Sequence, residues 1–269
     1  MKKMPNNPIG IFDSGAGGLS VWKEIDSLLP DESIVYYADN ANCPYGNKTR
    51  EEVIGHSVKA AQFLADRRCK IIVIACNTAT SLAIDCLRET FDIPFVGIVP
   101  AVKPAALNSK TGVIAILATA GTLKSGKFAD AKREFSGNTV IIPVESGELV
   151  SIVENGLQGT EQSDEVLRKY INPLLLQHID HLVLGCTHFP FLISDIKRIT
   201  GDSVILDNPA PAIAKRTKYI LESEKLTALS GNEKQAEFFS SGNIATLKRM
   251  VESITGIKPW MRFSETGRY

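Results

Sequence analysis

The stretches Val73-Ile-Ala-Cys76-Asn-Thr78 and Leu182-Val-Leu-Gly-Cys186-Thr-His188 share one pattern although they lie far apart in the chain. Each predicts a strand, a small residue, a cysteine and then a polar residue that opens a helix. Upstream of each lies another strand that ends in a small, glycine-containing turn, at Asp13-Ser-Gly15 and at Thr119-Ala-Gly121. Two related α/β halves, each offering one thiol, would explain this arrangement.

Short apolar runs alternate with amphipathic stretches, which is the pattern of parallel sheets flanked by helices. We expect strands at Ile9–Phe12, Ile34–Ala38, Ile71–Ala75, Phe95–Ile98, Val113–Leu117, Val140–Ile142, Leu182–Leu184 and Val204–Leu206. Thr49 and Glu52 have the spacing of a capping box at the start of a helix. Beyond these we expect a helix at Ala210–Ser223, an edge strand at Ala236–Ser241, a helix at Ile244–Ile254 and an extended piece at Pro259–Phe263.

The composition is that of an ordinary globular protein of 269 residues, 44% hydrophobic and 22% charged. Thirty basic residues balance thirty acidic ones, so there is no strong positive field to hold a nucleic acid. No apolar run approaches the ~20 residues of a membrane span, and the opening Met1–Met4 lacks the apolar segment of a secretion signal. We therefore expect a cytoplasmic protein with neither a nucleic-acid nor a membrane partner.

The five cysteines include no C-x-x-C pair and suit free thiols in a reducing compartment. Cys69 and Cys86 are interpreted as structural residues, and Cys43 is left open. Cys76 and Cys186 differ because each follows a strand, at the sheet edge where α/β proteins bind ligands. A helix N-terminus beside each sulfur would lower the pKa of its thiol and favour the thiolate.

Two glycine-rich stretches offer a nucleotide-binding alternative. Gly15 and Gly17 match the start of a dinucleotide-binding fingerprint, but Ser20 takes the place of its third glycine. Asp13 would also put a negative charge where a pyrophosphate would lie. The stretch from Gly121 to Phe128 matches a P-loop except at its last residue, where Mg²⁺ requires a hydroxyl. The sequence therefore disfavours a nucleotide-binding module, and the missing secretion signal disfavours a periplasmic-type binding protein.

Zinc is a further alternative, because Cys186 and His188 lie close together with His181 nearby. The chain has no compact four-ligand spacing, however. His178 and His181 flank the start of a strand, where we expect surface positions. The sequence therefore predicts no metal.

Five motifs follow one another along the chain: Asp13-Ser-Gly-Ala-Gly-Gly-Leu19, Pro44-Tyr-Gly46, Ala75-Cys-Asn-Thr-Ala79, Thr119-Ala-Gly-Thr122 and Gly185-Cys-Thr-His-Phe-Pro190. This series resembles that of the glutamate racemase family, and the resemblance extends from residue 9 to about residue 222. It implies two pseudo-symmetric α/β domains, each a mostly parallel sheet flanked by helices, with the active site in the interdomain cleft. The first domain would comprise residues 1–97 and 208–269, and the second residues 98–207.

Two thiols suit a racemase, since inversion through a planar carbanion requires a base on one face and an acid on the other. The resemblance implies that Cys76 takes the Cα proton from D-glutamate and Cys186 takes it from L-glutamate, without cofactor or metal. Asp13 would then assist Cys76, and His188 would assist Cys186, with Glu154 orienting the histidine.

The resemblance also implies which residues bind the ammonium and carboxylate groups of glutamate: Asp13, Ser14, Tyr45, Gly46, Asn77, Thr78, Thr187 and His188, with Thr119 and Thr122 as further positions. Hydroxyl and backbone N–H groups at helix N-termini can bind carboxylates without an arginine. D-Glutamate is a peptidoglycan component, so a role in bacterial cell-wall synthesis and cell shape is implied.

Some questions stay open at this level. A racemase of aspartate or another acid, or a decarboxylase, would share the general plan, and a homodimer is neither indicated nor excluded. The pair Asn208-Pro209 follows Asp207, where family members often have serine. The geometry at the expected return to the first domain is therefore undetermined.

Overall fold

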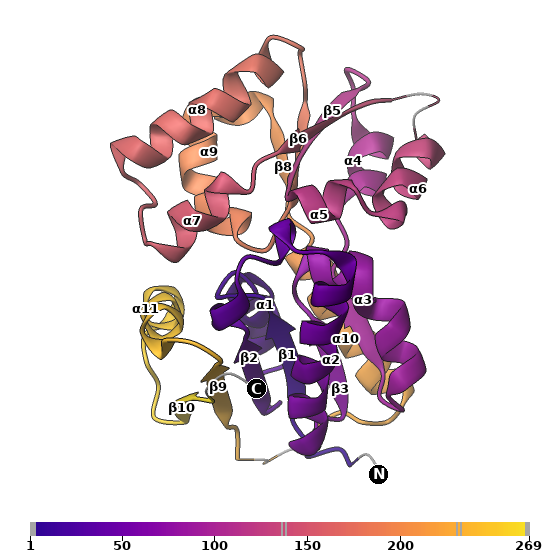
Figure 1. Ribbon diagram of the computed structural model, residues 1–269, viewed down its shortest axis with the longest axis vertical. Coiled ribbons are helices and arrows are strands. Elements are labelled where there is room, and N and C mark those ends of the chain that lie inside the picture. Colours follow the sequence, from indigo (N-terminus) through magenta and orange to yellow (C-terminus); the bar gives the residue numbers. More distant parts are fainter. Residues whose placement is uncertain (1–3, 136, 138, 230, 232, 267–269) are drawn as a thin grey trace.

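The computed structural model describes residues 4–135, 137, 139–229, 231 and 233–266. These form two sheets, one above the other in Figure 1, each flanked by helices. The paired strands of both sheets run parallel. The predicted α/β class is confirmed.

The first sheet has the strand order β10-β9-β2-β1-β3-β4. Its strands are β1 (Ile9–Asp13), β2 (Ile34–Ala38), β3 (Ile71–Ile74), β4 (Phe95–Gly97), β9 (Ala236–Ser240) and β10 (Met261–Glu265). The helices of this part are α1 (Leu19–Leu28), α2 (Arg50–Asp66), α3 (Asn77–Thr90), α10 (Ala210–Ser223) and α11 (Ile244–Thr255), with 3₁₀ turns η1 (Asn40–Asn42) and η2 (Tyr45–Asn47).

The second sheet has the order β6-β5-β7-β8. Its strands are β5 (Val113–Ala118), β6 (Val140–Glu145), β7 (His181–Gly185) and β8 (Ile205–Asp207). Its helices are α4 (Val102–Asn108), α5 (Ala120–Leu123), α6 (Gly126–Phe135), α7 (Glu148–Glu154), α8 (Glu161–Leu175) and α9 (Ile193–Thr200), with 3₁₀ turns η3 (Phe189–Leu192) and η4 (Gly201–Ser203).

The two sheets repeat one topology. The order β2-β1-β3-β4 in the first matches β6-β5-β7-β8 in the second, and the first sheet is extended by β9 and β10. Cys76 follows β3 and Cys186 follows β7, so the two cysteines come after equivalent strands. The internal repeat proposed from the sequence is therefore present in the fold.

Helices cover both faces of the first sheet because alternate residues of a strand point to opposite sides. Ile71 and Val73 of β3 belong to the core that includes α1 and α10. Ile72 and Ile74 belong to the core formed with α2 and α3. The predicted capping box at the start of α2 is confirmed, since the Thr49 side chain accepts the Glu52 N–H and the Glu52 carboxylate accepts the Thr49 N–H.

The expectation that Ala236–Ser241 forms an edge strand is wrong. β9 lies between β2 and β10, and β10 is the edge. Phe238 of β9 contacts Trp22 edge-on and stacks on Phe263 of β10 at 5.0 Å between ring centroids. Aromatic contacts between residues far apart in the chain thus hold β10 against β9.

The chain passes from the first sheet to the second between β4 and β5, and α10, which follows β8, packs against α1 of the first part. The domain division at 97/98 and 207/208 stays a prediction. Among the described residues, no helix combines the length and the apolar character needed to cross a bilayer.

Candidate active site

A small cavity lies where the carboxyl ends of the two sheets meet, as expected for ligand sites of α/β proteins. Its volume is about 10 Å³, which is room for roughly one water molecule. Residues that follow β1, β3, β5 and β7 contribute to its wall, which consists of Ser14, Pro44, Tyr45, Gly46, Cys76, Asn77, Thr78, Thr119, Val150, Gly185, Cys186, Thr187 and His188. Most of the residues predicted for the site line this cavity. The exceptions are Asp13, Thr122 and Glu154, which lie behind the wall and bond to Thr187, Thr78 and His188 respectively.

Asp13 organises the loop after β1. Its Oδ2 accepts the N–H groups of Gly15 and Gly18 at 3.3 and 2.9 Å, and its Oδ1 accepts the Thr187 hydroxyl at 3.4 Å. Complete burial raises the pKa of Asp13 from 3.8 to about 6, although the charge of His188 acts in the opposite direction. The carboxylate occupies loop N–H groups that a dinucleotide phosphate would need, which is further reason to reject that alternative.

Cys76 is the N-cap of α3, where its Sγ accepts the Ala79 N–H at 3.4 Å. Its thiol donates to Ser14 Oγ at 3.6 Å. The pKa of Cys76 is nevertheless raised to about 12, first by burial and then by the charge of Asp13, with Ala79 and Ser14 opposing the rise only in part. The expected lowering of this pKa by the helix N-terminus is therefore wrong, because a buried thiolate loses more hydration than one helix end replaces.

Cys186 has different surroundings. No α-helix begins beside it, since α9 starts only at Ile193 after the 3₁₀ turn η3. The expected helix N-terminus is therefore absent. Instead, the Cys186 Sγ lies 3.7 Å from Nδ1 of His188, and Nε2 of His188 lies 2.7 Å from Oε1 of Glu154. Thiol, imidazole and carboxylate thus form a continuous hydrogen-bonded chain.

The charges of this chain follow from its hydrogen bonds. Burial alone would lower the pKa of His188, but its bonds with Cys186 and Glu154 raise that pKa well above the ordinary 6.5. Burial alone would raise the pKa of Glu154, but its bond with His188 holds that pKa below 4.5. Imidazolium and carboxylate are therefore the stable pair, with Nε2 of His188 donating to Glu154.

Glu154 also joins the two halves of the molecule. It ends α7, and its Oε1 accepts the N–H of Ala16 from the loop after β1 at 2.8 Å. Its backbone oxygen accepts Nη2 of Arg249, on α11, at 2.5 Å. The carboxylate that orients His188 is thus itself fixed by the part of the chain that carries Asp13.

Several polar side chains contribute to the remaining wall of the cavity. Thr78 Oγ1 lies 2.9 Å from Thr119 Oγ1 and 3.4 Å from Thr122 Oγ1, so hydroxyls of both halves meet there. Asn77 is buried, and neither atom of its side-chain amide has a hydrogen-bond partner among the described residues. Burial of an unpaired amide is unfavourable, so this group is available to a ligand.

Sequence reasoning missed the role of Asp39 in holding Tyr45. The Tyr45 hydroxyl donates to Asp39 Oδ2 at 2.6 Å, and the Ser241 hydroxyl donates to Asp39 Oδ1 at 2.6 Å. Asn42 donates to the same carboxylate. Asp39 therefore fixes the segment that carries Tyr45 and Gly46 into the cavity. Its position directly after β2, at the carboxyl edge of the sheet, was the available signal.

The structure does not bring His181 to the site. His181 begins β7 and Cys186 follows the end of that strand, so the two residues lie at opposite edges of the sheet. We expected His181 at the surface, but it is buried in β7, which lies between β5 and β8, and its Nδ1 pairs with Asp207 at 2.8 Å. The zinc alternative built on Cys186, His188 and His181 is therefore wrong.

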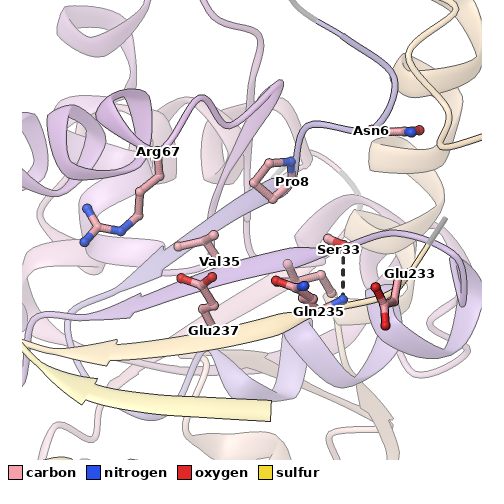
Figure 2. Close-up of a pocket in the computed structure, with 9 residues that line it drawn as sticks. Asn6, Pro8, Ser33, Val35, Arg67, Glu233, Gln235 and Glu237 are labelled. Atoms are coloured by element: carbon pink, nitrogen blue, oxygen red, sulfur yellow. Dashed lines mark hydrogen bonds between the residues drawn. The ribbon is translucent and has the colours of Figure 1, made fainter. Parts of the chain in front are cut away.

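A larger surface cavity, of about 400 Å³, lies near the amino ends of β2 and β9 (Figure 2). Its lining includes Arg67, Glu237 and Gln235, whose N–H donates to Ser33 Oγ at 3.1 Å. None of the described residues lining it is a cysteine or a histidine. Its location at the amino edge of the sheet also differs from the usual place of ligand sites, so we assign the active site to the smaller cavity.

Comparison with known proteins agrees with this geometry. A family model described as Asp/Glu/hydantoin racemase matches residues 9–215. The chain is 40% identical over 251 residues to a glutamate racemase of Herpetosiphon aurantiacus, covering 93% of this chain and 99% of that protein. It is 39% identical to one of Ralstonia pickettii, covering 97% and 92% of the two chains.

Solved structures give the same result. Glutamate racemase isoform RacE1 of Bacillus anthracis superposes with a TM-score of 0.87 at 32% identity, over 97% of this chain and 98% of that chain. The Escherichia coli glutamate racemase, solved with L-glutamate and the activator UDP-MurNAc-Ala, superposes with a TM-score of 0.85 at 32% identity, over the same shares of the two chains.

Proposed function

The chain belongs to the glutamate racemase family and is an isomerase that interconverts L- and D-glutamate; we propose that Cys76 and Cys186 are its two proton-transfer groups. The observation that carries this mechanism is that two cysteines, each following the equivalent strand of its own sheet, line one small cavity. No cofactor or metal is required by this proposal.

The proton balance is simple. A thiolate takes the Cα proton of glutamate, so that a C–H bond breaks and an S–H bond forms. The thiol on the other face then gives its proton to the planar carbanion, which forms the new C–H bond and leaves a thiolate there. Cys186 would be the base for L-glutamate and Cys76 the base for D-glutamate, and the two sulfurs exchange protonation states in each turnover.

The neighbours of the two sulfurs support these roles. The raised pKa of Cys76 makes it the thiol, ready to act as the acid toward a carbanion formed from L-glutamate. The imidazolium of His188 lies beside Cys186 and would balance the negative charge of a thiolate there. For the reverse direction, the ammonium group of bound D-glutamate would add positive charge near Cys76 and so reduce the cost of ionising it.

Substrate binding is assigned to the polar side chains of the cavity wall. We place the carboxylates of glutamate against the Asn77 amide and the hydroxyls of Thr78 and Thr187, with Ser14 and the Tyr45–Gly46 segment completing the wall. Asp13 would meet the ammonium group. A cavity of about 10 Å³ does not hold a glutamate molecule, so the two halves must separate to admit it.

The same proposal assigns residues 1–97 and 208–269 to one domain and 98–207 to the other, so that each domain contributes one thiol. It places the reaction in the cytoplasm and makes D-glutamate available for peptidoglycan precursors. The crystal structure of the Escherichia coli relative contains UDP-MurNAc-Ala as an activator, which supports this role for the family.

The test is proton exchange at the substrate's Cα. Chelator-treated protein is incubated with L-glutamate in D₂O, and the enantiomers and their deuterium content are measured by chiral chromatography and mass spectrometry. We expect D-glutamate that carries Cα deuterium. Racemisation without incorporation of solvent deuterium, or loss of activity on chelator treatment, would contradict the proposal. Faster racemisation of aspartate than of glutamate would overturn the substrate assignment.

A further inference from the structure

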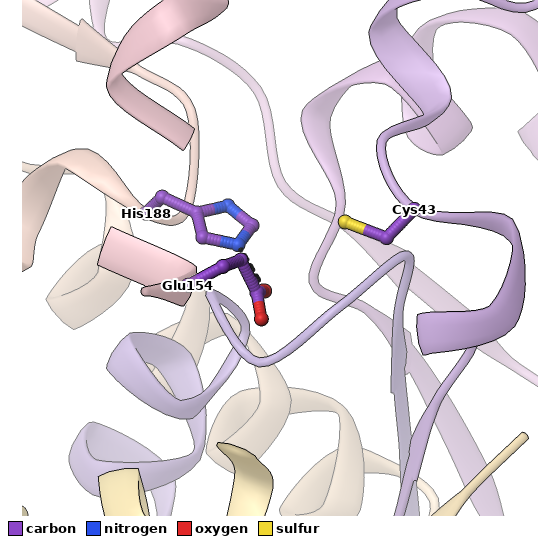
Figure 3. A group of neighbouring side chains, drawn as sticks. All are labelled: Cys43, Glu154 and His188. Atoms are coloured by element: carbon purple, nitrogen blue, oxygen red, sulfur yellow. Dashed lines mark hydrogen bonds and ion pairs between the residues drawn. The ribbon is translucent and has the colours of Figure 1, made fainter. Parts of the chain in front are cut away.

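Cys43 lies next to the catalytic residues although the proposed reaction does not use it. Its Sγ, a carboxylate oxygen of Glu154 and a ring nitrogen of His188 all lie within 4.8 Å of one another. Figure 3 shows the three side chains converging from separate segments. We propose that Cys43, Glu154 and His188 form a binding site for Zn²⁺ or another thiophilic divalent cation, and that the bound cation inhibits the enzyme.

The donor set fits zinc. Thiolate sulfur, imidazole nitrogen and carboxylate oxygen are the three ligand types that Zn²⁺ takes in proteins, and three protein ligands leave a fourth position for water or substrate. Bonds of 2.0–2.3 Å place tetrahedral ligand atoms roughly 3.3–3.8 Å apart. A contraction of about 1 Å would therefore bring the widest pair of the cluster to zinc-binding distance.

Because residue 15 is glycine, no side chain at this position comes between the ligand atoms. A Cβ at Gly15 would lie 2.9 Å from the Cys43 Sγ and would overlap Oε1 of Glu154. Any other residue would thus enter the region that the cation would occupy. The glycine of the loop after β1 thereby leaves the sulfur and the carboxylate facing each other.

The carboxylates near Cys43 favour a cation, and the proton of the His188 imidazolium must leave before the cation binds. Burial raises the pKa of the Cys43 thiol, and the negative charges of Glu154 and Asp13 raise it further. Charges that oppose a lone thiolate at Cys43 stabilise a divalent cation at the same point, and the cation in turn allows the thiol to ionise. On binding, one Zn²⁺ enters and the protons of Cys43 Sγ and His188 Nε2 leave to solvent.

Inhibition follows from the capture of His188, and this step rests on the proposed function. A cation on Nε2 replaces the hydrogen bond between His188 and Glu154. The imidazole then no longer carries the proton that balances a thiolate at Cys186. Proton transfer on that face is blocked while the cation is bound.

Binding is tested on the reduced full-length protein with Co²⁺ and Zn²⁺ as probes. We expect a thiolate-to-cobalt charge-transfer band and tight Zn²⁺ binding by calorimetry in the wild type. The same results are expected for Cys86→Ser, which removes a half-buried thiol on α3 outside the cluster. Cys43→Ser should lose the band and bind Zn²⁺ at least about tenfold more weakly.

An unchanged band in Cys43→Ser would overturn the site. If the band were then lost in Cys186→Ser, the metal would lie on a catalytic thiol instead. Circular dichroism checks that the variants fold, and Cys43→Ala serves if the serine variant does not.

Inhibition is tested separately. Micromolar Zn²⁺ should slow glutamate racemisation by the wild type and by Cys86→Ser, and a chelator should restore the rate. Cys43→Ser should keep the basal rate and resist the metal. Equal inhibition of Cys43→Ser would refute the inhibitory mechanism. Cys43-dependent binding by a protein without racemase activity would instead refute the proposed function and leave the site standing.

Discussion

Cys76 and Cys186 hold equivalent positions after β3 and β7 but have unlike neighbours. Cys76 lies at the N-terminus of α3, donates to Ser14 and is close enough to Asp13 for that charge to raise its pKa. Cys186 has no helix of its own, and its neighbour is the imidazole of His188, backed by Glu154. The backbone plan is repeated, whereas the acid–base chemistry around each sulfur is not.

The reaction therefore does not need identical surroundings for the two thiols, although the two halves share one fold. L- and D-glutamate have equal free energies in solution, so kcat/KM must be equal in the two directions for the wild type and every variant. The overall kcat/KM therefore cannot reveal the unlike surroundings of the two thiols. A measurement on the proton-abstraction step of one enantiomer can. Isotope exchange and isotope effects report such steps.

The largest effect should come from removing either sulfur. We expect Cys76→Ser and Cys186→Ser to lower racemisation roughly 10²–10⁴-fold, because each variant lacks an acid–base group on one face. Each should still exchange the Cα proton with D₂O on the intact face: Cys76→Ser with L-glutamate, and Cys186→Ser with D-glutamate. NMR of each enantiomer measures this exchange.

Cys86→Ser is the matched control and should behave as the wild type. Exchange of the same enantiomer by both cysteine variants would mean that the two sulfurs do not act on opposite faces.

The groups that assist each thiol come next. Asp13→Asn and His188→Asn should each lower kcat/KM about 10²-fold, equally in both directions. The primary isotope effect should rise with Cα-deuterated D-glutamate for Asp13→Asn, and with Cα-deuterated L-glutamate for His188→Asn, because each change slows abstraction on its own side.

His178→Asn is the control, since His178 is exposed and has a positive φ that Asn tolerates. Identical isotope effects in the two site variants would show that Asp13 and His188 are not specific to one sulfur.

The buried carboxyl group on the Cys76 side should also make stability depend on pH. The pKa of Asp13 is raised from 3.8 to about 6 in the folded protein, so the folded state holds this proton more tightly than the unfolded chain. Protonated Asp13 therefore contributes up to about 3 kcal/mol to the free energy of unfolding. This contribution is complete below about pH 4 and is lost as the pH rises through about 6.

Urea unfolding of the wild type and Asp13→Asn at pH 4 and pH 7 tests this prediction. The stability of the wild type should fall relative to the variant as the pH rises. A difference that stays constant, or changes in the opposite direction, would contradict the raised pKa.

The smallest effect should follow from neutralising Glu154. In Glu154→Gln the side-chain oxygen can still accept from His188 and Ala16, but the charge that raises the pKa of His188 is lost. We expect a fall in activity of about tenfold and a shift of the basic limb of the kcat profile to lower pH. Glu148→Gln, at the exposed start of α7, should change neither, and an unshifted profile in Glu154→Gln would exclude an electrostatic role.

Motifs that combine neighbouring residues could be read from the sequence because their geometry is local. Thr49 and Glu52 cap a helix wherever one begins, and a cysteine directly after a buried strand must lie at the edge of a sheet. The strand order beyond residue 208 could not be read in this way. The place of β9 depends on contacts of Phe238 with Trp22 and Phe263, which no local pattern encodes.

The sequence by itself determined the α/β class and the repeat of two halves, because these follow from periodicity and from the cysteine that follows each equivalent strand. Most of the cavity residues were predicted from motifs that resemble those of a known family. Only the tertiary structure decided the charge states and the neighbours across the halves. The pKa of Cys76 rises because burial outweighs the effect of a helix end. His181 is buried and pairs with Asp207, and Cys43 lies beside Glu154 and His188, which come from distant segments. Desolvation and long-range contact depend on how separate elements pack, which no short stretch of sequence specifies.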